Sequence, residues 1–425
     1  MQAFFLNPKI NRCFSWVQKG GFAVLDQTLF AGTNFLVGVL LARWLEPNAY
    51  GAFSTAYAVF LFVGTLHAAL WTEPMLVYGS GKFREQYQQY QKILLAYHWR
   101  FGLTSSAVFI LLGIFFFYAG QAELGRSFVG LAIASPLILY LWLIRRSAYV
   151  LLTPQHAAFG GLLYMLLYIG ISFILLQFNI LDETSALSAM GIAGLLSGKL
   201  VERNIHKQKK YHTEPETVET NTIYHLHWQY GRWAILAGGL SWVPGNIYFL
   251  VLPAIKSLDA SAALKALMNL AMPILHFNSA LAGLFVPIFV RAIQNNGLKQ
   301  KLQIAFGALI GSSLVFWVIL IVWGEWLTIF VYNERYIFNL NYFVLLGIFP
   351  LLSSIANTIS AVLRAENRPE EVARAYTYAV AGTVLIGLPL AYWQGIIGAL
   401  SGIVIANGLL VFGLLIKFKD SKIKA

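Results

Sequence analysis

Three polar side chains interrupt long apolar segments near the N-terminus, and the two carboxylates among them could bind an ion. Asp26 and Asn34 fall within the apolar stretch 22–42, and Glu73 lies directly before Pro74 in the stretch 50–77. A charge in hydrocarbon costs about 2.5 kcal/mol or more, so such residues usually face a cavity or a partner. Since buried carboxylates can bind a proton or Na⁺, we predict Asp26 and Glu73 as ion-coupling residues.

Each of these residues also has a simpler interpretation. Asp26 could lie at a membrane–water interface, and Asn34 could hydrogen-bond a neighbouring helix. Glu73 could form an ion pair with Lys82 or Arg100. The sequence leaves these alternatives open.

The composition indicates that the elements carrying these residues cross a membrane. The chain is 58% hydrophobic and 11% charged, whereas a soluble domain is about 25% charged. A membrane-spanning helix needs about 20 mostly apolar residues. Twelve segments meet this requirement, so we predict an all-α membrane protein with helices at about 22–42, 50–77, 93–118, 127–150, 157–177, 186–201, 230–252, 264–290, 301–323, 340–363, 373–393 and 395–416.

The distribution of Lys and Arg predicts the orientation of these helices. If the N-terminus is cytoplasmic, 25 of the 30 Lys and Arg residues fall on the cytoplasmic side. Cytoplasmic loops of membrane proteins are enriched in these residues. We therefore expect both termini in the cytoplasm. The net charge of +12 then needs no nucleic-acid partner.

A polar stretch divides the chain into two predicted halves. The segment 202–229 is basic and then acidic, and it separates the sixth apolar stretch from the seventh. We interpret it as a cytoplasmic linker between an N-terminal six-helix bundle, 1–201, and a C-terminal six-helix bundle, 230–425.

A weak internal repeat supports this division. Shifting the chain by 213 residues aligns several charged residues and prolines: Arg43 with Lys256, Glu46 with Asp259, and Pro74 with Pro287. Transporters often consist of duplicated bundles. With six helices per half, the repeat predicts two pseudo-symmetric bundles about an axis along the membrane normal.

Two short stretches resemble a known family. Asn34–Gly51 contains Leu-Ala-Arg43, a polar turn and Tyr50-Gly51, and Val362–Pro369 contains Leu-Arg364-Ala and a polar turn. Both are similar to stretches of Wzx-type polysaccharide flippases of the multidrug/oligosaccharidyl-lipid/polysaccharide (MOP) exporter superfamily. The resemblance implies a protein of the bacterial inner membrane that moves a lipid-linked oligosaccharide, for O-antigen or another surface polysaccharide, to the periplasmic leaflet by alternating access.

The resemblance also implies roles for particular residues. Arg43, Lys256, Asn34 and Arg145 are the expected substrate-binding residues, because cations would lower the cost of moving a diphosphate across the membrane. The expected partners are the lipid-linked oligosaccharide, the lipid bilayer and other polysaccharide-assembly proteins. No cofactor is expected beyond a coupling H⁺ or Na⁺. Alternatively, Arg43 and Lys256 reach the interface as ordinary snorkelling residues, and Arg145 serves only as an orientation signal.

Several other functions lack their sequence signals. No Gly-x-x-x-x-Gly-Lys-Ser/Thr loop for ATP occurs, and no His/Cys/Asp cluster has metal-ligand spacing. We therefore expect a protein that is not an enzyme. The alternatives are a cation-coupled exporter of small amphiphiles, a membrane enzyme of glycan assembly that would depend on Glu46 or Glu325, and a non-catalytic scaffold.

Overall fold

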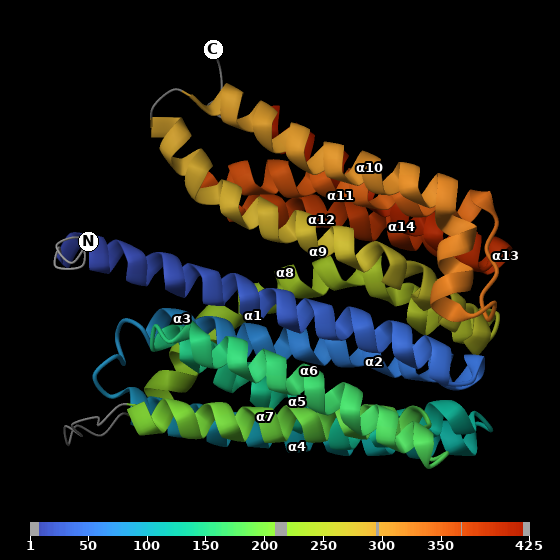
Figure 1. Ribbon diagram of the computed structural model, residues 1–425, viewed down its shortest axis with the longest axis horizontal. Helices are drawn as coiled ribbons and strands as arrows, with labels where there is room; N and C mark the ends of the chain where they lie inside the picture. The colour runs from blue at the N-terminus through green and yellow to red at the C-terminus, as the bar shows by residue number, and fades with distance from the viewer. Residues whose placement is uncertain (1–7, 209–218, 295–296, 367, 420–425) are drawn as a thin grey trace, which may run out of the picture. The chain divides into compact units, whose positions relative to one another are not determined.

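The computed structural model describes residues 8–208, 219–294, 297–366 and 368–419, and these residues form helices and short connections without a strand (Figure 1). The α-helices of the first half are α1 (Pro8–Trp44), α2 (Pro47–His67), α3 (Glu73–Tyr78), α4 (Tyr87–Tyr118), α5 (Ala122–Val150), α6 (Pro154–Gln177) and α7 (Glu183–Gln208). Those of the second half are α8 (Thr220–Ile255), α9 (Leu258–Gln294), α10 (Leu298–Tyr332), α11 (Leu340–Ala365), α12 (Pro369–Gly382), α13 (Leu388–Gln394) and α14 (Ile396–Lys419).

Twelve helical spans among the described residues are long and apolar enough to cross a membrane, which confirms the predicted fold class. The ends differ from the prediction by several residues. The sixth span, predicted as 186–201, runs over Glu183–Lys207, and the eighth begins at Leu258 rather than at 264. Part of the predicted linker, 209–218, and the terminal segments 1–7 and 420–425 lie outside the described residues. The predicted orientation of the termini stays a prediction.

Two of the spans contain a short π-helix. Residues Ala68–Thr72 join α2 to α3, and Thr383–Gly387 join α12 to α13. A π-helix disturbs the regular hydrogen-bond ladder and is common at functional sites. At the first one, Nδ1 of His227 donates to the Leu70 carbonyl at 2.7 Å. Because a carbonyl only accepts, Nε2 of His227 is left to accept from the Tyr90 hydroxyl, also at 2.7 Å.

The helices form two compact units. Unit 1 consists of Met1–Val37 and Phe60–Leu236, and unit 2 of Gly38–Val59 and Ala237–Ala425. Unit 2 therefore includes the connection between α1 and α2 with the adjoining helix ends, and unit 1 includes the first part of α8. The units are defined by contacts, whereas the predicted halves 1–201 and 230–425 are defined by sequence. The division into two repeated halves stays a prediction.

Unit 1 is organised around α5, which packs side by side with α4 and α7 (Figure 1). Small residues allow α5 and α7 to approach closely. A Cβ atom added to Gly191 would lie 2.7 Å from the Ala134 Cα atom, and one added to Gly130 would lie 2.8 Å from the Thr184 carbonyl oxygen. In the most apolar 18-residue stretch of α5, 78% of the residues are buried, whereas in the corresponding stretch of α4 only 22% are buried. α5 is therefore the inner helix of this unit.

Unit 2 is organised around α11, which packs against α9, α10 and α14. α14 packs in turn against α12 and α13. The apolar cluster between α11, α12 and α14 includes Ile359, Leu363, Ala375, Ala406 and Leu414. α10 contributes least to this interior, because only 22% of its apolar window is buried.

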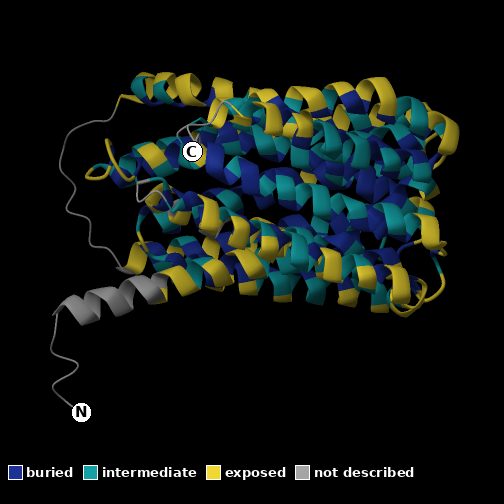
Figure 2. Ribbon diagram, turned by 90° about the horizontal axis from the view of Figure 1, so that it is seen from above, coloured by how far each residue is buried: buried dark blue, intermediate teal, exposed yellow. Residues whose placement is uncertain are grey.

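Large apolar side chains are exposed along the outer helices. On α10 they include Val315, Val318, Val322, Trp326 and Phe330. Exposed positions follow the outward faces of the helices while buried positions gather inside (Figure 2). A surface this apolar suits lipid better than water.

Candidate functional site

Four charged side chains are buried in the part of the chain that the structure describes: Asp26, Arg145, Glu183 and Lys265. Buried charges inside a membrane are costly and usually functional. Their partners therefore define the places where chemistry can occur.

Asp26 and Arg145 form an ion pair with each other. Oδ1 of Asp26 accepts from Nη2 of Arg145 at 2.7 Å and from Nε at 3.0 Å. Oδ2 of Asp26 accepts from the hydroxyl of Tyr149 at 2.7 Å. The exposed fraction of the side chain is 0% for Asp26 and 9% for Arg145. The pair is thus sealed from solvent, and both oxygens of the carboxylate are hydrogen-bonded.

Helical spacing places these groups opposite one another. On α1, Asp26 and Phe30 are four residues apart and share a face, and Arg145 and Tyr149 do the same on α5. The guanidinium carbon of Arg145 lies 4.0 Å from the centre of the Phe30 ring, in cation–π contact. On α6, a Cβ atom added to Gly161 would lie 3.4 Å from Oδ1 of Asp26. The site is therefore closed by α1, α5 and α6.

The structure thus brings together two residues for which the sequence predicted separate roles. Asp26 was predicted to bind a coupling ion and Arg145 to bind substrate. In the ion pair, Arg145 blocks cation binding at Asp26, and Asp26 blocks anion binding at Arg145. A proton on Asp26 would free the guanidinium, and an anion on Arg145 would free the carboxylate. This exchange is the chemistry that the arrangement permits.

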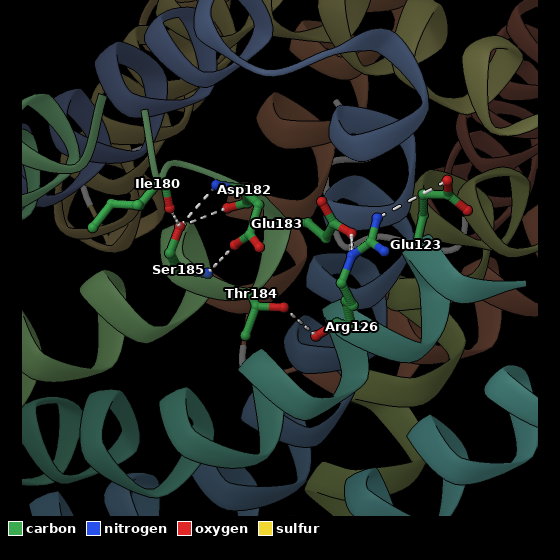
Figure 3. Close-up of polar contacts among 7 residues, drawn as sticks. All are labelled: Glu123, Arg126, Ile180, Asp182, Glu183, Thr184 and Ser185. Carbon is green, nitrogen blue, oxygen red and sulfur yellow. Dashed lines mark hydrogen bonds and ion pairs between the residues drawn. The ribbon is translucent and has the colours of Figure 1, made fainter. Parts of the chain in front are cut away.

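A second buried carboxylate, Glu183, pairs with Arg126 near the predicted outer ends of α5 and α7. Nε of Arg126 donates to Oε1 of Glu183 at 2.6 Å, and Glu123 lies 4.0 Å from the same guanidinium (Figure 3). The hydroxyl of Thr184 donates to the Arg126 carbonyl at 2.9 Å. The first turns of the two helices are therefore fastened together. We interpret this cluster as structural; sequence reasoning missed it because Arg126 and Glu183 are 57 residues apart.

The other predicted substrate-binding cations are exposed. Arg43 lies near the end of α1 and Lys256 just after α8, both in unit 2. Neither side chain forms an ion pair within the described chain. Instead, Arg335 donates to the carbonyls of Arg43 and Leu45 and so fixes the turn between α1 and α2. The structure therefore leaves both cations available but does not join them.

A hollow of about 540 Å³ lies beside Arg43. Apart from Arg43 and Asn333 it is lined by apolar side chains of α1 and α10: Val39, Trp326, Ile329, Phe330 and Val331. It is open to the surface of unit 2. A single cation next to an apolar groove is suited to an amphiphile with an anionic head.

Asn34 and Glu73 are not part of the buried ion pair. Asn34 is half-buried on α1, and Glu73 is exposed at the first residue of α3, directly after the π-helix. In the described chain Glu73 forms no ion pair, so the alternative pairing with Lys82 or Arg100 is absent there. The predicted roles of Asn34 and Glu73 stay predictions.

Lys265 is a buried charge that the sequence did not single out. Its exposed fraction is 7%, and its Nζ lies 5.2 Å from the ring centre of Tyr57 and 5.7 Å from that of Phe249. The predicted span began at 264, which put Lys265 at the interface. The helix begins at Leu258, so the lysine lies two turns inside it. Its position among Ala and Leu residues was the available signal.

Together, the fold and these buried charges define a polytopic membrane protein of twelve helices in two compact units. No protein-family model matches the sequence. No curated protein matches it either.

Solved structures of transporters share this fold over almost the whole chain. An inward-facing multidrug resistance MATE family transporter of the MOP superfamily aligns with a TM-score of 0.74 and 14% identity, covering 94% of this chain and 98% of that one. An outward-facing structure of such a transporter gives 0.63, with 13% identity and 94% and 95% coverage. A eukaryotic MATE transporter, AtDTX14, gives 0.61, with 14% identity and 96% and 97% coverage. The chain therefore has the twelve-helix MATE fold.

Proposed function

We propose that this chain is a membrane transporter of the MOP superfamily that works by alternating access. We further propose that it exports small amphiphilic molecules in exchange for a cation. The observation that carries this proposal is the whole-length similarity to multidrug resistance transporters, with a TM-score of 0.74 to an inward-facing one. The same fold is known facing outward, which supports alternation between two states.

The buried ion pair supplies a coupling centre for such a cycle. A cation can drive transport only if it binds one conformation better than the other. Binding of H⁺ or Na⁺ at Asp26 would compete with Arg145, which donates to the same carboxylate oxygen at 2.7 Å. Because the two residues lie on α1 and α5, this competition would change how firmly the two helices are held together.

Transport by the purified full-length chain in proteoliposomes tests this function. The probe is tetraphenylphosphonium, a small amphiphilic cation, and its accumulation is measured under an imposed pH or Na⁺ gradient. One-for-one exchange with H⁺ sustains about tenfold accumulation per pH unit. We expect accumulation by the wild type and its loss in Asp26→Asn, with probe-for-probe exchange at equal pH retained.

Glu123→Gln is the matched control, because Glu123 is an exposed carboxylate of the same unit, with 38% of its side chain accessible. We expect this variant to accumulate the probe as the wild type does. A wild-type protein that neither exchanges nor accumulates the probe would contradict the proposed exporter. Full accumulation by Asp26→Asn would remove Asp26 from the coupling centre.

The Arg43 hollow supports a second candidate, the flipping of a lipid-linked oligosaccharide. Its apolar walls on α1 and α10 could accept a lipid chain while Arg43 holds the diphosphate. This function agrees with the resemblance of Asn34–Gly51 to polysaccharide flippases. The similarity to multidrug transporters favours the exporter over it.

Complementation separates the two candidates. In a strain that lacks this gene, Arg43→Ala would abolish surface polysaccharide and accumulate lipid-linked intermediate on the inner face if the chain is a flippase. Rescue by Arg43→Lys would mean that positive charge suffices without bidentate contact. Normal polysaccharide in the deletion strain itself would eliminate the flippase.

A further inference from the structure

Lys265 differs from the other buried charges because, among the residues that the structure describes, it has no counter-ion. Asp26 and Arg145 neutralise each other, and Glu183 is paired with Arg126. In the described part of the chain, no carboxylate lies within ion-pair distance of Lys265. The lysine is nevertheless buried, with an exposed fraction of 7%. A buried ammonium without a counter-ion costs free energy in any single fixed state. An ionisable residue of this kind inside a membrane is a functional site by default.

Two aromatic rings pack against Lys265, and among the described residues it forms no ion pair. From α2 the facing group is the titratable side chain of Tyr57, and from α8 it is Phe249. Tyr57 stacks on Phe53 at 5.8 Å, so its ring is held in place. Tyr248, the neighbour of Phe249, packs instead against Gly387 and Gly402. The two rings stabilise an ammonium when it is present.

A row of polar side chains connects Lys265 with the start of α9. Ser257, Ser261, Lys265 and Asn269 recur every four residues and so follow one face of the helix. Ser257 is exposed and caps the first turn by accepting from the Ala260 amide at 3.2 Å. Lys265 lies seven residues after the helix start, which is about 10 Å along the axis. Two hydroxyl groups therefore lie between the predicted outer end of α9 and the amine, on the same face of the helix.

We propose that Lys265 carries a coupling proton through unit 2, alternating between a neutral amine and an ammonium. This inference rests on the proposed cation-coupled exchange and names H⁺ as a coupling ion. The amine takes one H⁺ from water when the site is open, and the ammonium returns it to water on the other side, so charge and atoms balance. A proton can bind the amine without moving any neighbouring side chain. An anionic ligand at the same place would have to displace the ring of Tyr57 or Phe249.

Variants that fix the charge of residue 265 test the proposal in proteoliposomes with tetraphenylphosphonium. Lys265→Met keeps an unbranched side chain, one atom shorter, and is always neutral, whereas Lys265→Arg is always charged. We expect Lys265→Met to exchange probe for probe at equal pH within twofold of the wild type. Its accumulation under a difference of one pH unit falls about tenfold, because one proton per cycle is no longer moved. Lys265→Arg loses both activities.

Lys299→Met is the matched control, since Lys299 is an exposed lysine on α10 of the same unit. We expect it to behave as the wild type in both assays. Thermal unfolding of Lys265→Met is measured as well, and we expect a midpoint no lower than that of the wild type, because an apolar unbranched side chain replaces an uncompensated charge.

Four results would overturn the proposal. Unchanged accumulation by Lys265→Met would mean that the residue moves no proton. Full activity of Lys265→Arg with loss of exchange in Lys265→Met would mean that a fixed positive charge suffices and that the residue carries no proton. A lowered unfolding midpoint of Lys265→Met would assign the lysine to packing. Absence of wild-type exchange would refute the transport function itself, and this inference with it.

Discussion

Breaking the ion pair between Asp26 and Arg145 from one side leaves a buried charge without compensation. Removing one partner of a buried pair costs about 3–5 kcal/mol, whereas removing both is often close to neutral. Asp26→Asn leaves the guanidinium of Arg145, which is 9% exposed and cannot lose its proton. We therefore expect the full cost of about 3–5 kcal/mol for this variant.

Arg145→Met has a smaller expected cost. The carboxylate that remains can take up a proton, and the Tyr149 hydroxyl still donates to it at 2.7 Å. We expect about 1–3 kcal/mol for this variant, and about 1–2 kcal/mol or less for Asp26→Asn combined with Arg145→Met. The double variant is thus more stable than the Asp26→Asn variant alone.

Thermal unfolding in lipid nanodiscs, followed by tryptophan fluorescence, measures these differences. For a chain of this length, 1 kcal/mol corresponds to about 1–2 °C in the midpoint. The Asp26→Asn midpoint should fall by about 3–10 °C. Glu123→Gln is the control, because it removes an exposed ion pair at 4.0 Å, expected to contribute less than about 1 kcal/mol. Additive losses in the double variant would refute the conclusion that the two buried charges compensate each other.

Three further substitutions test other contacts. Gly191→Val should separate α5 from α7, because its Cβ atom would lie 2.7 Å from the Ala134 Cα atom, and we expect a loss of about 1–3 kcal/mol or more in the same unfolding assay. Tyr90→Phe removes the hydroxyl that donates to His227 and leaves its buried Nε2 unpaired, which should cost about 1–3 kcal/mol; an unchanged midpoint would contradict this bond. Asn278→Ala removes the amide that contacts three serine hydroxyls of α10 and α11 at 2.8–2.9 Å. We expect the unfolding midpoint to fall by about as much as for Tyr90→Phe. The control is Asn48→Ala, at an exposed position, which should leave the midpoint unchanged.

The spans could be predicted because they depend on local composition. A run of about 20 apolar residues identifies a membrane helix wherever its neighbours lie. The ends could not be predicted as well, since the helices continue past the apolar runs into polar residues, as α9 does at Leu258. This boundary error of six residues moved Lys265 from the interior of a helix to its edge and removed it from the candidate site.

The buried pair could not be predicted, because it depends on which helices touch. Asp26 and Arg145 are 119 residues apart, and nothing in either helix specifies that α1 packs against α5. Both residues were predicted as functional on the principle that charges are rare in apolar segments, and the fold adds that they form one site. The π-helices were also outside the reach of sequence patterns, because one extra residue per turn leaves no compositional signal.

The assignment of Gly38–Val59 to unit 2 has a consequence for the order in which the protein is made. Asn269 donates to the Tyr50 hydroxyl at 2.8 Å across a separation of 219 residues. At a synthesis rate of about 5–20 residues per second, Asn269 is added to the chain roughly 10–40 s after Tyr50. During that time the first two helices are already in the membrane.

Two hydroxyl groups of α2 have carbonyl partners within α1 and α2 and do not depend on the later residues. The Tyr50 hydroxyl donates to the Gly38 carbonyl at 2.9 Å, and the Thr55 hydroxyl lies 2.9 Å from the Gly51 carbonyl. The later residues add a further contact to each: the amide of Asn269 to Tyr50 and the carbonyl of Phe249 to Thr55. The Tyr50 and Thr55 hydroxyls in the earliest part of unit 2 are therefore already hydrogen-bonded while the rest of the unit is being synthesised.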